Sequence, residues 1–418
     1  TAGTPRCSTC NDKLTPPPRS ADPIPRRPAK TTSSKMAAMT HEQRPATAPD
    51  FLLSRPDRSI RTQGRKATFP DPFEASTALR NKDADLIVGA FPFDTSLRAA
   101  LMEPETVTRA EGPLEPPAFF RGKGAARHLT VESVEPQTTT EEHTAMVAAA
   151  VATIQQSRLE KVVLARAVDI TYAETVDPLL IAARLIDLSA YRDGFAVDLS
   201  ATGRDEYQGA MFVGSSPEML IRRDGREISA FPLAGSAPRT GSLSIDDATA
   251  RELGSSDKDL REHRFVVEHY RRVLEPLCET LDIPATPEIH ETNEMIHLGT
   301  QIAGTLKDDE YSALDLALML HPTPAIGGTP TDDALGVIAQ EKSPREFYSG
   351  AVGWCDSSGD GEFMVSIRCA IVEDNTARAW AGGGIVVDSI PAMEAEETSA
   401  KLQTALRALN VPAALRKI

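Results

Sequence analysis

Apolar and polar residues alternate with a period of two in several stretches of the chain, and this pattern is typical of half-buried strands. The alternation is clearest from 161 to 170, and a short apolar run at 86–91 indicates a further strand. On these grounds the sequence predicts strands at 86–91, 161–170, 209–214, 218–223, 227–233, 362–372 and 377–387.

Longer stretches between these strands predict helices at about 139–156, 176–188, 257–280 and 392–409. Thr139 and Glu142 form a capping-box signal at the start of the first helix. Strands separated by long helices, together with a hairpin-turn sequence at 357–361, favour an antiparallel-rich α+β fold.

The first 48 residues differ from the rest. They are rich in Pro, Ser, Thr and Ala, lack periodic apolar positions, and cannot offset the entropy of ordering. We therefore expect residues 1–48 to be a disordered tail and residues 49–418 to be a single catalytic domain. Because Met36 and Met39 are the first methionines, we hypothesise that the natural chain begins at Met39.

The composition of the 418-residue chain, 41% hydrophobic and 25% charged, is typical of a globular protein. The sequence contains neither an apolar run long enough to span a membrane nor a signal-peptide core, so we expect a cytoplasmic protein without a membrane partner. Five scattered cysteines do not form a disulfide framework, and the Cys7–Cys10 pair lacks the further ligands of a zinc site.

Charge is unevenly distributed along the chain. The net charge of −15 argues against nucleic acid as a partner. Residues 1–48 hold eight Lys or Arg and three acids, so this stretch carries about +5 and the remainder about −20. An anionic substrate would therefore need a locally positive site inside an acidic body.

The predicted C-terminal helix carries Glu394, Glu397 and Lys401 at spacings that place them on one face. Two carboxylates and an ammonium group on one face can hold a hard cation and an anionic group side by side. Spacing alone favours a plainer interpretation, a solvated helix with an ordinary Glu–Lys ion pair.

Glu262 is a further candidate, near the start of the predicted helix 257–280, where the helix dipole favours an acid. Taken by itself it is an ordinary surface residue. Mg²⁺ prefers few carboxylates, completed by water and substrate oxygens, so Glu262 with Glu397 would suffice as a magnesium site.

Arg368 falls in the middle of the predicted strand 362–372, on the face that also carries Ser366 and Ala370. A guanidinium among small neighbours suits bidentate capture of a carboxylate, and a surface arginine is the alternative. The glycines at 382–384 allow a ligand to approach the backbone closely, although such a run is as often a bulge or turn.

Two further charged residues flank predicted strands. Lys161 opens one strand, and Glu218 follows a Ser-Pro pair at the start of another. A lysine in a partly dry site can lose its proton and act as a base, and a buried carboxylic acid can act as the acid. Taken one at a time, each is more simply a charged residue at a strand edge.

In their order along the chain, several segments from about 139 to 409 resemble the chorismate-utilising enzymes related to anthranilate synthase component I, and most closely the isochorismate synthases. So many ordered matches exclude chance. The segments are K-V-V-L-A-R at 161–166, G-S-S-P-E-M-L at 214–220, L-A-G-S-A at 233–237, K-D-L-R-E-H at 258–263, H-L-G-T at 297–300, H-P-T-P-A at 321–325, R-E-F-Y-S-G-A-V-G-W-C-D at 345–356, S-I-R-C-A at 366–370 and G-G-G-I-V at 382–386.

The resemblance implies the large α+β fold of this family, with extensive antiparallel sheets surrounded by helices. It implies that Lys161 is the general base that activates water and that Glu218 is the general acid. It further implies that Glu262 and Glu397 bind Mg²⁺, with Glu394 in support.

The resemblance also implies a set of substrate-binding residues. Those expected to hold the enolpyruvyl side of chorismate are Tyr348, Arg368, Lys401 and the backbone amides around Gly383 and Gly384. Those expected to line the ring pocket are Gly235, His297 and Thr300. Gly383 and Tyr348 depart from many relatives, which have Ala and Phe there, and the added hydroxyl of Tyr348 bears on product fidelity.

The implied reaction adds water at C2 of chorismate and removes the C4 hydroxyl, giving isochorismate, the first step of both siderophore and menaquinone routes. Ammonia-using relatives typically lack the lysine at the position of Lys161, so water is favoured here. A salicylate synthase, which also eliminates pyruvate, is the alternative, and a non-catalytic chorismate-binding protein is a third reading. We expect a monomer without a glutaminase subunit.

Overall fold

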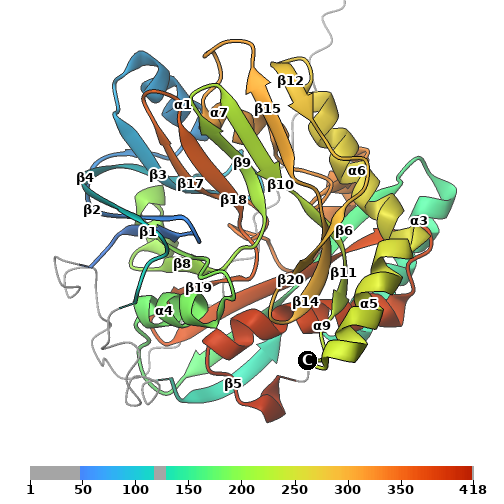
Figure 1. Ribbon diagram of the computed structural model, residues 1–418. Coiled ribbons are helices and arrows are strands. Elements are labelled where there is room, and N and C mark those ends of the chain that lie inside the picture. The colour runs from blue at the N-terminus through green and yellow to red at the C-terminus, as the bar shows by residue number, and fades with distance from the viewer. Residues whose placement is uncertain (1–47, 117–128, 417–418) are drawn as a thin grey trace, which may run out of the picture. The chain divides into compact units, whose positions relative to one another are not determined.

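The computed structural model describes residues 48–116 and 129–416. The predictions for the N-terminal tail, including a start at Met39, lie outside the described residues except at the tail's last position. Every strand pairing recorded between described strands is antiparallel, and helices pack against several parts of the sheet (Figure 1). The predicted antiparallel-rich α+β fold is confirmed.

Seventeen of the described strands belong to one continuous sheet. In the order of their pairings they are β5 (Val131–Pro136), β6 (Lys161–Tyr172), β20 (Thr376–Val386), β19 (Cys369–Glu373), β8 (Met211–Gly214), β7 (Gly194–Asp198), β1 (Phe51–Ser54), β2 (Arg58–Phe69), β4 (Ala100–Glu111), β3 (Leu86–Phe91), β17 (Ala351–Asp356), β18 (Gly361–Val365), β9 (Met219–Asp224), β10 (Glu227–Phe231), β15 (Ile302–Leu306) and β12 (Cys278–Asp282), with β16 (Gly328–Thr329) on the first residues of β6.

A second, small sheet lies beside the first. Its strands are β11 (Leu233–Pro238), β14 (Met295–Gly299) and β13 (Glu288–Glu291). The α-helices in the described residues are α1 (Pro72–Asn81), α3 (Thr140–Gln156), α4 (Pro178–Leu188), α5 (Leu243–Ser255), α6 (Asp257–Leu274), α7 (Ala313–Leu320), α8 (Thr331–Ile338) and α9 (Pro391–Ala408). Among them, none is long and apolar enough to cross a membrane.

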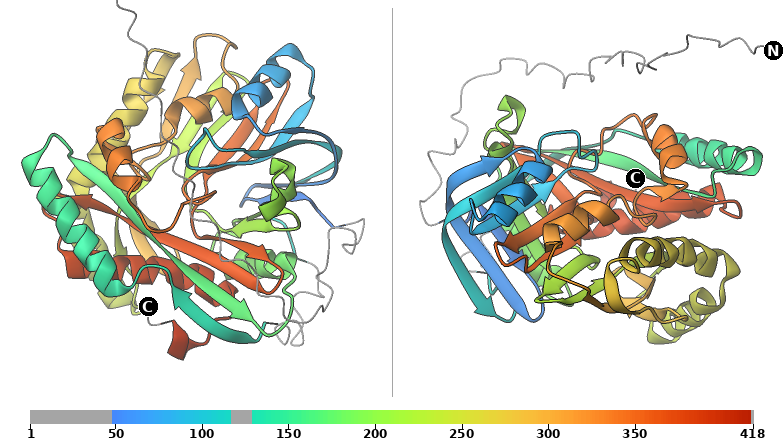
Figure 2. Two further views of the ribbon diagram at one scale, coloured as in Figure 1. Left: turned by 180° about the vertical axis from the view of Figure 1, so that it is seen from behind. Right: turned by 90° about the horizontal axis from the view of Figure 1, so that it is seen from above.

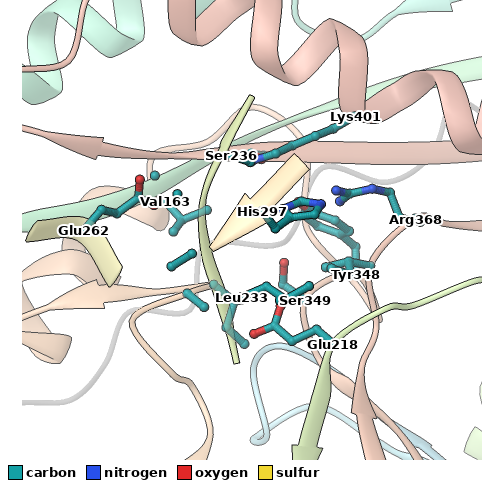
Figure 3. A pocket seen from close by; sticks show the side chains of 17 residues that line it. Val163, Glu218, Leu233, Ser236, Glu262, His297, Tyr348, Ser349, Arg368 and Lys401 are labelled. Atoms are coloured by element: carbon teal, nitrogen blue, oxygen red, sulfur yellow. The ribbon is translucent and has the colours of Figure 1, made fainter. Parts of the chain in front are cut away.

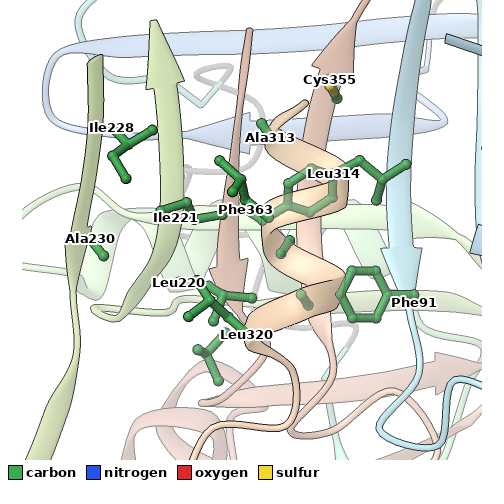
Figure 4. Close-up of a cluster of buried hydrophobic side chains, with 14 of the residues drawn as sticks. Phe91, Leu220, Ile221, Ile228, Ala230, Ala313, Leu314, Leu320, Cys355 and Phe363 are labelled. Carbon is green, nitrogen blue, oxygen red and sulfur yellow. The ribbon is translucent and has the colours of Figure 1, made fainter. Parts of the chain in front are cut away.

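The large sheet changes direction along its length. In Figures 1 and 2, strands β3, β17, β18, β9 and β10 run at a steep angle to β19, β20 and β6. Apolar side chains pack on each part, and a further cluster that includes Val352, Met364 and Trp380 joins the two parts. Leu314 of α7 packs with Ile221 and Phe363 over the first group of strands (Figure 4), whereas α4 and α9 cover the second group. The candidate site lies where the two groups meet.

The prediction of one continuous strand over 362–372 is wrong at residues 366–368. β18 ends at Val365, β19 begins at Cys369, and Arg368 between them has a left-handed φ of 51°. The break arises because β18 pairs with β17 and β9, whereas β19 pairs with β8 and β20. The chain therefore crosses from one group of strands to the other at 366–368, and Arg368 belongs to this crossing.

Two other boundaries differ from the predictions, in each case at a proline. The expected helix 257–280 stops at Leu274, since Pro276 follows and cannot continue the helical hydrogen bonds. The expected strand 227–233 divides at Pro232 into β10 and β11, which join different sheets. Helices α1, α5, α7 and α8 were not among the predicted elements.

The capping box at the start of α3 is present. Thr139 Oγ1 accepts from the Glu142 N–H at 3.2 Å, and Glu142 Oε2 accepts from the Thr139 N–H at 3.0 Å. We expect Thr139→Ala to lower the free energy of unfolding by about 1 kcal/mol, because two amide groups lose their partners. Urea unfolding measures this loss. Thr153→Ala, in the exposed interior of the same helix, is the control and should not destabilise the protein.

Candidate active site

Many of the predicted site residues surround one small cavity of about 50 Å³ (Figure 3). The predicted residues in its lining are Glu218, Gly235, Glu262, His297, Tyr348, Arg368, Gly384 and Lys401. Those that do not line it are Lys161, Thr300, Gly383, Glu394 and Glu397. The fold thus brings residues from widely separated parts of the chain to one point.

Lys161 lies directly behind the cavity wall. It opens β6 and is 0% exposed, and its Nζ is 3.1 Å from Oε1 of Glu262, which lines the cavity. Among the described residues, Nζ makes no hydrogen bond. A Cβ at Gly384 would overlap the Glu262 carboxylate and come within 3.0 Å of the Lys161 side chain. This close packing of lysine and carboxylate against β20 therefore requires glycine at 384.

Glu218 is buried at the opposite side of the cavity from Lys401 (Figure 3). The turn before β9 places it there, with its backbone N–H donating to Ser216 Oγ at 3.2 Å. Burial raises the pKa of Glu218 to about 7, although the backbone of Leu233 and the charge of Lys161 oppose the rise. The carboxyl is therefore partly protonated near neutral pH and can donate a proton.

Helix α9 contributes two carboxylates, and each is paired with a lysine. Lys401 Nζ lies 2.5 Å from Glu397 Oε1, so the shared helix face predicted from their spacing is present. Lys258, from α6, lies 2.7 Å from Glu394 Oε1. Together with the pair at Glu262, three lysine–glutamate pairs stand side by side where α6 and α9 approach β20.

The two α9 carboxylates differ in protonation. Burial, and then the negative charge of Glu397, raise the pKa of Glu394 to about 7, against the attraction of Lys258. Burial also acts to raise the pKa of Glu397, but attraction and hydrogen bonding from Lys401 outweigh it and hold the value below normal. Glu397 is therefore more fully ionised near neutral pH than Glu394.

These side chains form an all-oxygen donor set that suits a hard cation such as Mg²⁺. Glu394 Oε2 is buried and has no hydrogen-bond partner among the described residues, Glu262 pairs with Lys161, and Glu397 contacts Lys401 and the Ser236 hydroxyl. Within 48–116 and 129–416, however, no three metal-ligating side chains converge on one point. The residues fit a cation chemically. To bind one, the paired lysine side chains must move away from the carboxylates.

The positive side of the cavity is formed by Arg368 and Lys401 (Figure 3). Lys401 Nζ donates to the carbonyl of Gly382 at 3.2 Å, which fixes it against β20. Tyr348 stacks on Trp380 with ring centroids 6.2 Å apart, and burial raises its pKa to about 12, so its hydroxyl stays protonated. Two cations and a hydroxyl donor thus face one space, an arrangement that recognises a carboxylate.

The remaining wall is uncharged. Burial first, and then the charge of Arg368, hold the pKa of His297 well below its usual value, and its Nε2 has no partner among the described residues. Gly235 has a φ of 80°, a conformation that favours glycine. Thr300 is linked to the cavity indirectly, through His263. Its hydroxyl lies 2.7 Å from Nε2 of His263, and Nδ1 of His263 lies 3.0 Å from the Ala234 carbonyl.

Sequence reasoning assigned no role to His263, Lys258 or Ser236. His263 and Lys258 belong to the same K-D-L-R-E-H segment as Glu262, and Ser236 to L-A-G-S-A with Gly235, so membership in a matched segment was the available signal. Ser236 Oγ donates to Glu397 Oε1 at 2.9 Å, a contact between positions 161 residues apart that local patterns cannot reveal.

Comparison with known proteins agrees with this geometry. The family described as "Chorismate binding enzyme" matches residues 121–410. The chain belongs to the chorismate-binding enzyme family. The family resemblance predicted from the sequence motifs is confirmed.

Individual relatives match nearly their whole length. A Mycobacterium tuberculosis protein provisionally named isochorismate synthase MenF is 42% identical over 87% of this chain and 96% of its own. Isochorismate synthase DhbC of Bacillus subtilis is 36% identical over 91% of this chain and 98% of its own. The crystal structure of a Bacillus anthracis protein provisionally assigned as a 2,3-dihydroxybenzoate-specific isochorismate synthase has a TM-score of 0.79, with 35% identity over 87% of this chain and 96% of the other.

One departure from the chorismate-binding family's usual pattern is structurally neutral. A Cβ at Gly383 would meet Thr398 Cγ2 at 3.5 Å and Glu394 Oε2 at 3.7 Å, which are ordinary contacts. The alanine of many relatives would therefore fit here, unlike at Gly384.

Proposed function

We propose that this enzyme converts chorismate into isochorismate by adding water at C2 and releasing the C4 hydroxyl. One observation carries the proposal: Glu218, a buried carboxyl that is partly protonated near neutral pH, faces a cavity that also holds Arg368 and Lys401 and is backed by Lys161. A protonated acid, a buried amine and two cations are the groups this reaction of a dianion needs. The isochorismate synthases among its relatives give independent support.

Lys161 and Glu218 divide the proton chemistry between them. In the proposal, the amino group of Lys161 takes a proton from the attacking water as the C2–O bond forms. Glu218 gives its proton to the C4 hydroxyl, which leaves as water, and the ring double bonds shift between the two carbons. The proton that Lys161 gains balances the proton that Glu218 loses, so the net reaction is an isomerisation.

Binding the substrate is assigned to the positive wall. Arg368 and Lys401, with the Tyr348 hydroxyl and the backbone around Gly383 and Gly384, hold the enolpyruvyl carboxylate, since two cations offset a charge that an acidic protein otherwise repels. The ring is proposed to lie against His297 and Gly235, with Thr300 supporting them through His263.

Mg²⁺ is the proposed cofactor, held by Glu262 and Glu397 with Glu394 in support. When bound, it supplies positive charge that stabilises the ring carboxylate as electron density builds there. The lysines that now pair with these carboxylates hold them in place, and Lys401 also keeps the pKa of Glu397 below normal.

Incubating the purified protein with chorismate and Mg²⁺, with and without EDTA, tests the proposal. Chromatography with mass detection should show isochorismate that disappears when EDTA is present. Salicylate together with pyruvate would instead identify a salicylate synthase, and an unchanged substrate would identify a non-catalytic binding protein.

Glu397→Gln should raise the Mg²⁺ concentration needed for half-maximal activity by at least about tenfold, because an ionised ligand becomes a neutral amide. The measurement is a Mg²⁺ titration of the initial rate. Glu275→Gln, which removes an exposed acid at the far end of α6, is the matched control. An unchanged titration for Glu397→Gln would move the metal site elsewhere.

The remaining features of the proposal concern the whole protein. Residues 49–418 are proposed to act as one catalytic domain, as a monomer in the cytoplasm and without a glutaminase subunit. A menaquinone-specific isochorismate synthase of Escherichia coli and a vibriobactin-specific one of Vibrio cholerae both match the chain, so the product is assigned to the start of a menaquinone or a siderophore route.

A further inference from the structure

A second and larger hollow lies next to the candidate active site, between the N-terminal end of α9 and helices α5 and α6. Its volume is about 350 Å³. We call it the acidic vestibule, because its lining includes the acids Glu252, Asp259, Asp388, Glu394, Glu396 and Glu397. Lys258 is the one basic residue among the described residues that line it.

Ion pairs separate the vestibule from the active-site cavity. Ser236 lines both hollows, and its hydroxyl donates to Glu397 on the vestibule side. Glu397 in turn pairs with Lys401, which lines the cavity. An ion that enters the vestibule therefore meets Glu394 and Glu397 before it reaches the cavity.

The vestibule also contains a buried group that lacks a partner. Glu394 is 1% exposed, and its Oε2 makes no hydrogen bond of good geometry within the described part of the chain, although the Ser389 side chain lies near enough to lower the pKa of the carboxyl. The other oxygen accepts from Lys258, whose side chain is 27% exposed. A buried carboxylate oxygen without a donor, at the inner end of an acid-lined hollow, points to a cation as the missing partner.

Size distinguishes the two hollows as routes for such a cation. A hexahydrated divalent ion needs room for six waters, roughly 60–90 Å³ when each water takes about 10–15 Å³. The cavity, at about 50 Å³, is too small for that shell, whereas the vestibule is several times larger than required. In the described conformation the vestibule has room for a hydrated cation, whereas the cavity would have to open for one, as it must for chorismate.

We propose that the acidic vestibule is the path by which a hydrated divalent cation reaches Glu394 and Glu397. The exposed acids Glu252 and Glu396 attract the cation, together with Asp388, whose charge is partly offset by its ion pair with Arg261. These three acids lie outside the catalytic and cation-binding set, so they act through their electrostatic field, which concentrates the cation near Glu394 and Glu397 and strengthens its binding. A dianionic substrate is repelled by the same charges. The inference rests on the proposed function, because the cation is the one assigned to that site.

The test is Mn²⁺ binding, followed by electron paramagnetic resonance, to a variant that combines Glu252→Gln, Asp388→Asn and Glu396→Gln. At low ionic strength it should bind Mn²⁺ roughly tenfold more weakly than the unmodified protein, and high salt should close the gap by screening. The control combines Asp83→Asn, Asp282→Asn and Glu310→Gln, which remove equal charge from exposed positions outside the vestibule. The control should bind Mn²⁺ normally.

Three outcomes would overturn the inference. If the vestibule variant binds Mn²⁺ normally while Glu397→Gln does not, the metal site stands and the vestibule is not its path. If the vestibule variant instead lowers the KM for chorismate with Mn²⁺ binding unchanged, the vestibule admits the substrate. If the unmodified protein binds no Mn²⁺, with or without chorismate, the proposed metal site fails as well.

Discussion

Lys161→Ala should lower kcat by about 10²–10⁴-fold, because the amine proposed to take the proton of the attacking water is removed. The side chain is fully buried and reaches no solvent base that could replace it. Initial rates of isochorismate formation measure the loss, and circular dichroism shows whether the fold is retained. Normal turnover in this variant would exclude Lys161 as the base.

A second variant separates the catalytic role of Lys161 from its structural role as the partner of Glu262. Removing the lysine leaves Glu262 without its partner at 3.1 Å, which by itself costs stability. Lys161→Arg keeps a cation opposite Glu262, but a guanidinium does not lose its proton at neutral pH. We therefore expect Lys161→Arg to be inactive although folded. Substantial activity in this variant would mean that charge, and not proton transfer, is what the position supplies.

Glu218→Gln should lower kcat by a similar factor, about 10²–10⁴-fold, since an amide cannot protonate the departing hydroxyl. The direction in which kcat/KM changes with pH follows from the pKa of Glu218. The acid form is the active one, and the pKa of Glu218 is raised to about 7, so kcat/KM should fall as the pH rises through about 7. The residual activity of Glu218→Gln should lack this decline.

Stability provides a check on the Glu218 variant. A carboxyl whose pKa is raised by folding favours the folded state below its ordinary pKa of 4.5, and that contribution is lost as the pH rises towards 7. Glutamine does not ionise, so Glu218→Gln should be at least as stable as the unmodified protein at pH 8. Thermal unfolding at that pH tests this, and an active variant that retains the decline near pH 7 would exclude Glu218 as the acid.

Local sequence patterns predicted the elements that carry the site better than the site itself. Lys161 at the start of a strand and Glu397 with Lys401 on one helix face follow directly from periods of two and of about four residues. Arg368 was placed in the middle of a strand, because alternation continues through 362–372 although the chain changes partners there. Pairing with β8, β9, β17 and β20 is decided by distant segments, so the local pattern could not reveal the break.

The pairing of charges was also beyond local reasoning. Lys258 and Glu394 are 136 residues apart, yet they form an ion pair at the inner end of the vestibule. From the sequence, only the ordered motifs of the family indicated that α6 and α9 lie close together. These motifs assigned a role to Glu262 but not to Lys258. Packing of α6 and α9 against β20, where Gly384 leaves room for the Glu262 carboxylate, explains the arrangement physically.

The central claim is that water adds at C2 while the C4 hydroxyl leaves. Turnover of chorismate in oxygen-18 water, followed by mass spectrometry of the isochorismate before the reverse reaction proceeds far, tests this claim most directly. The account predicts that the product carries one heavy oxygen in its ring hydroxyl. Isochorismate that carries no heavy oxygen would show that the original hydroxyl migrates within the ring, and would contradict the roles of both Lys161 and Glu218.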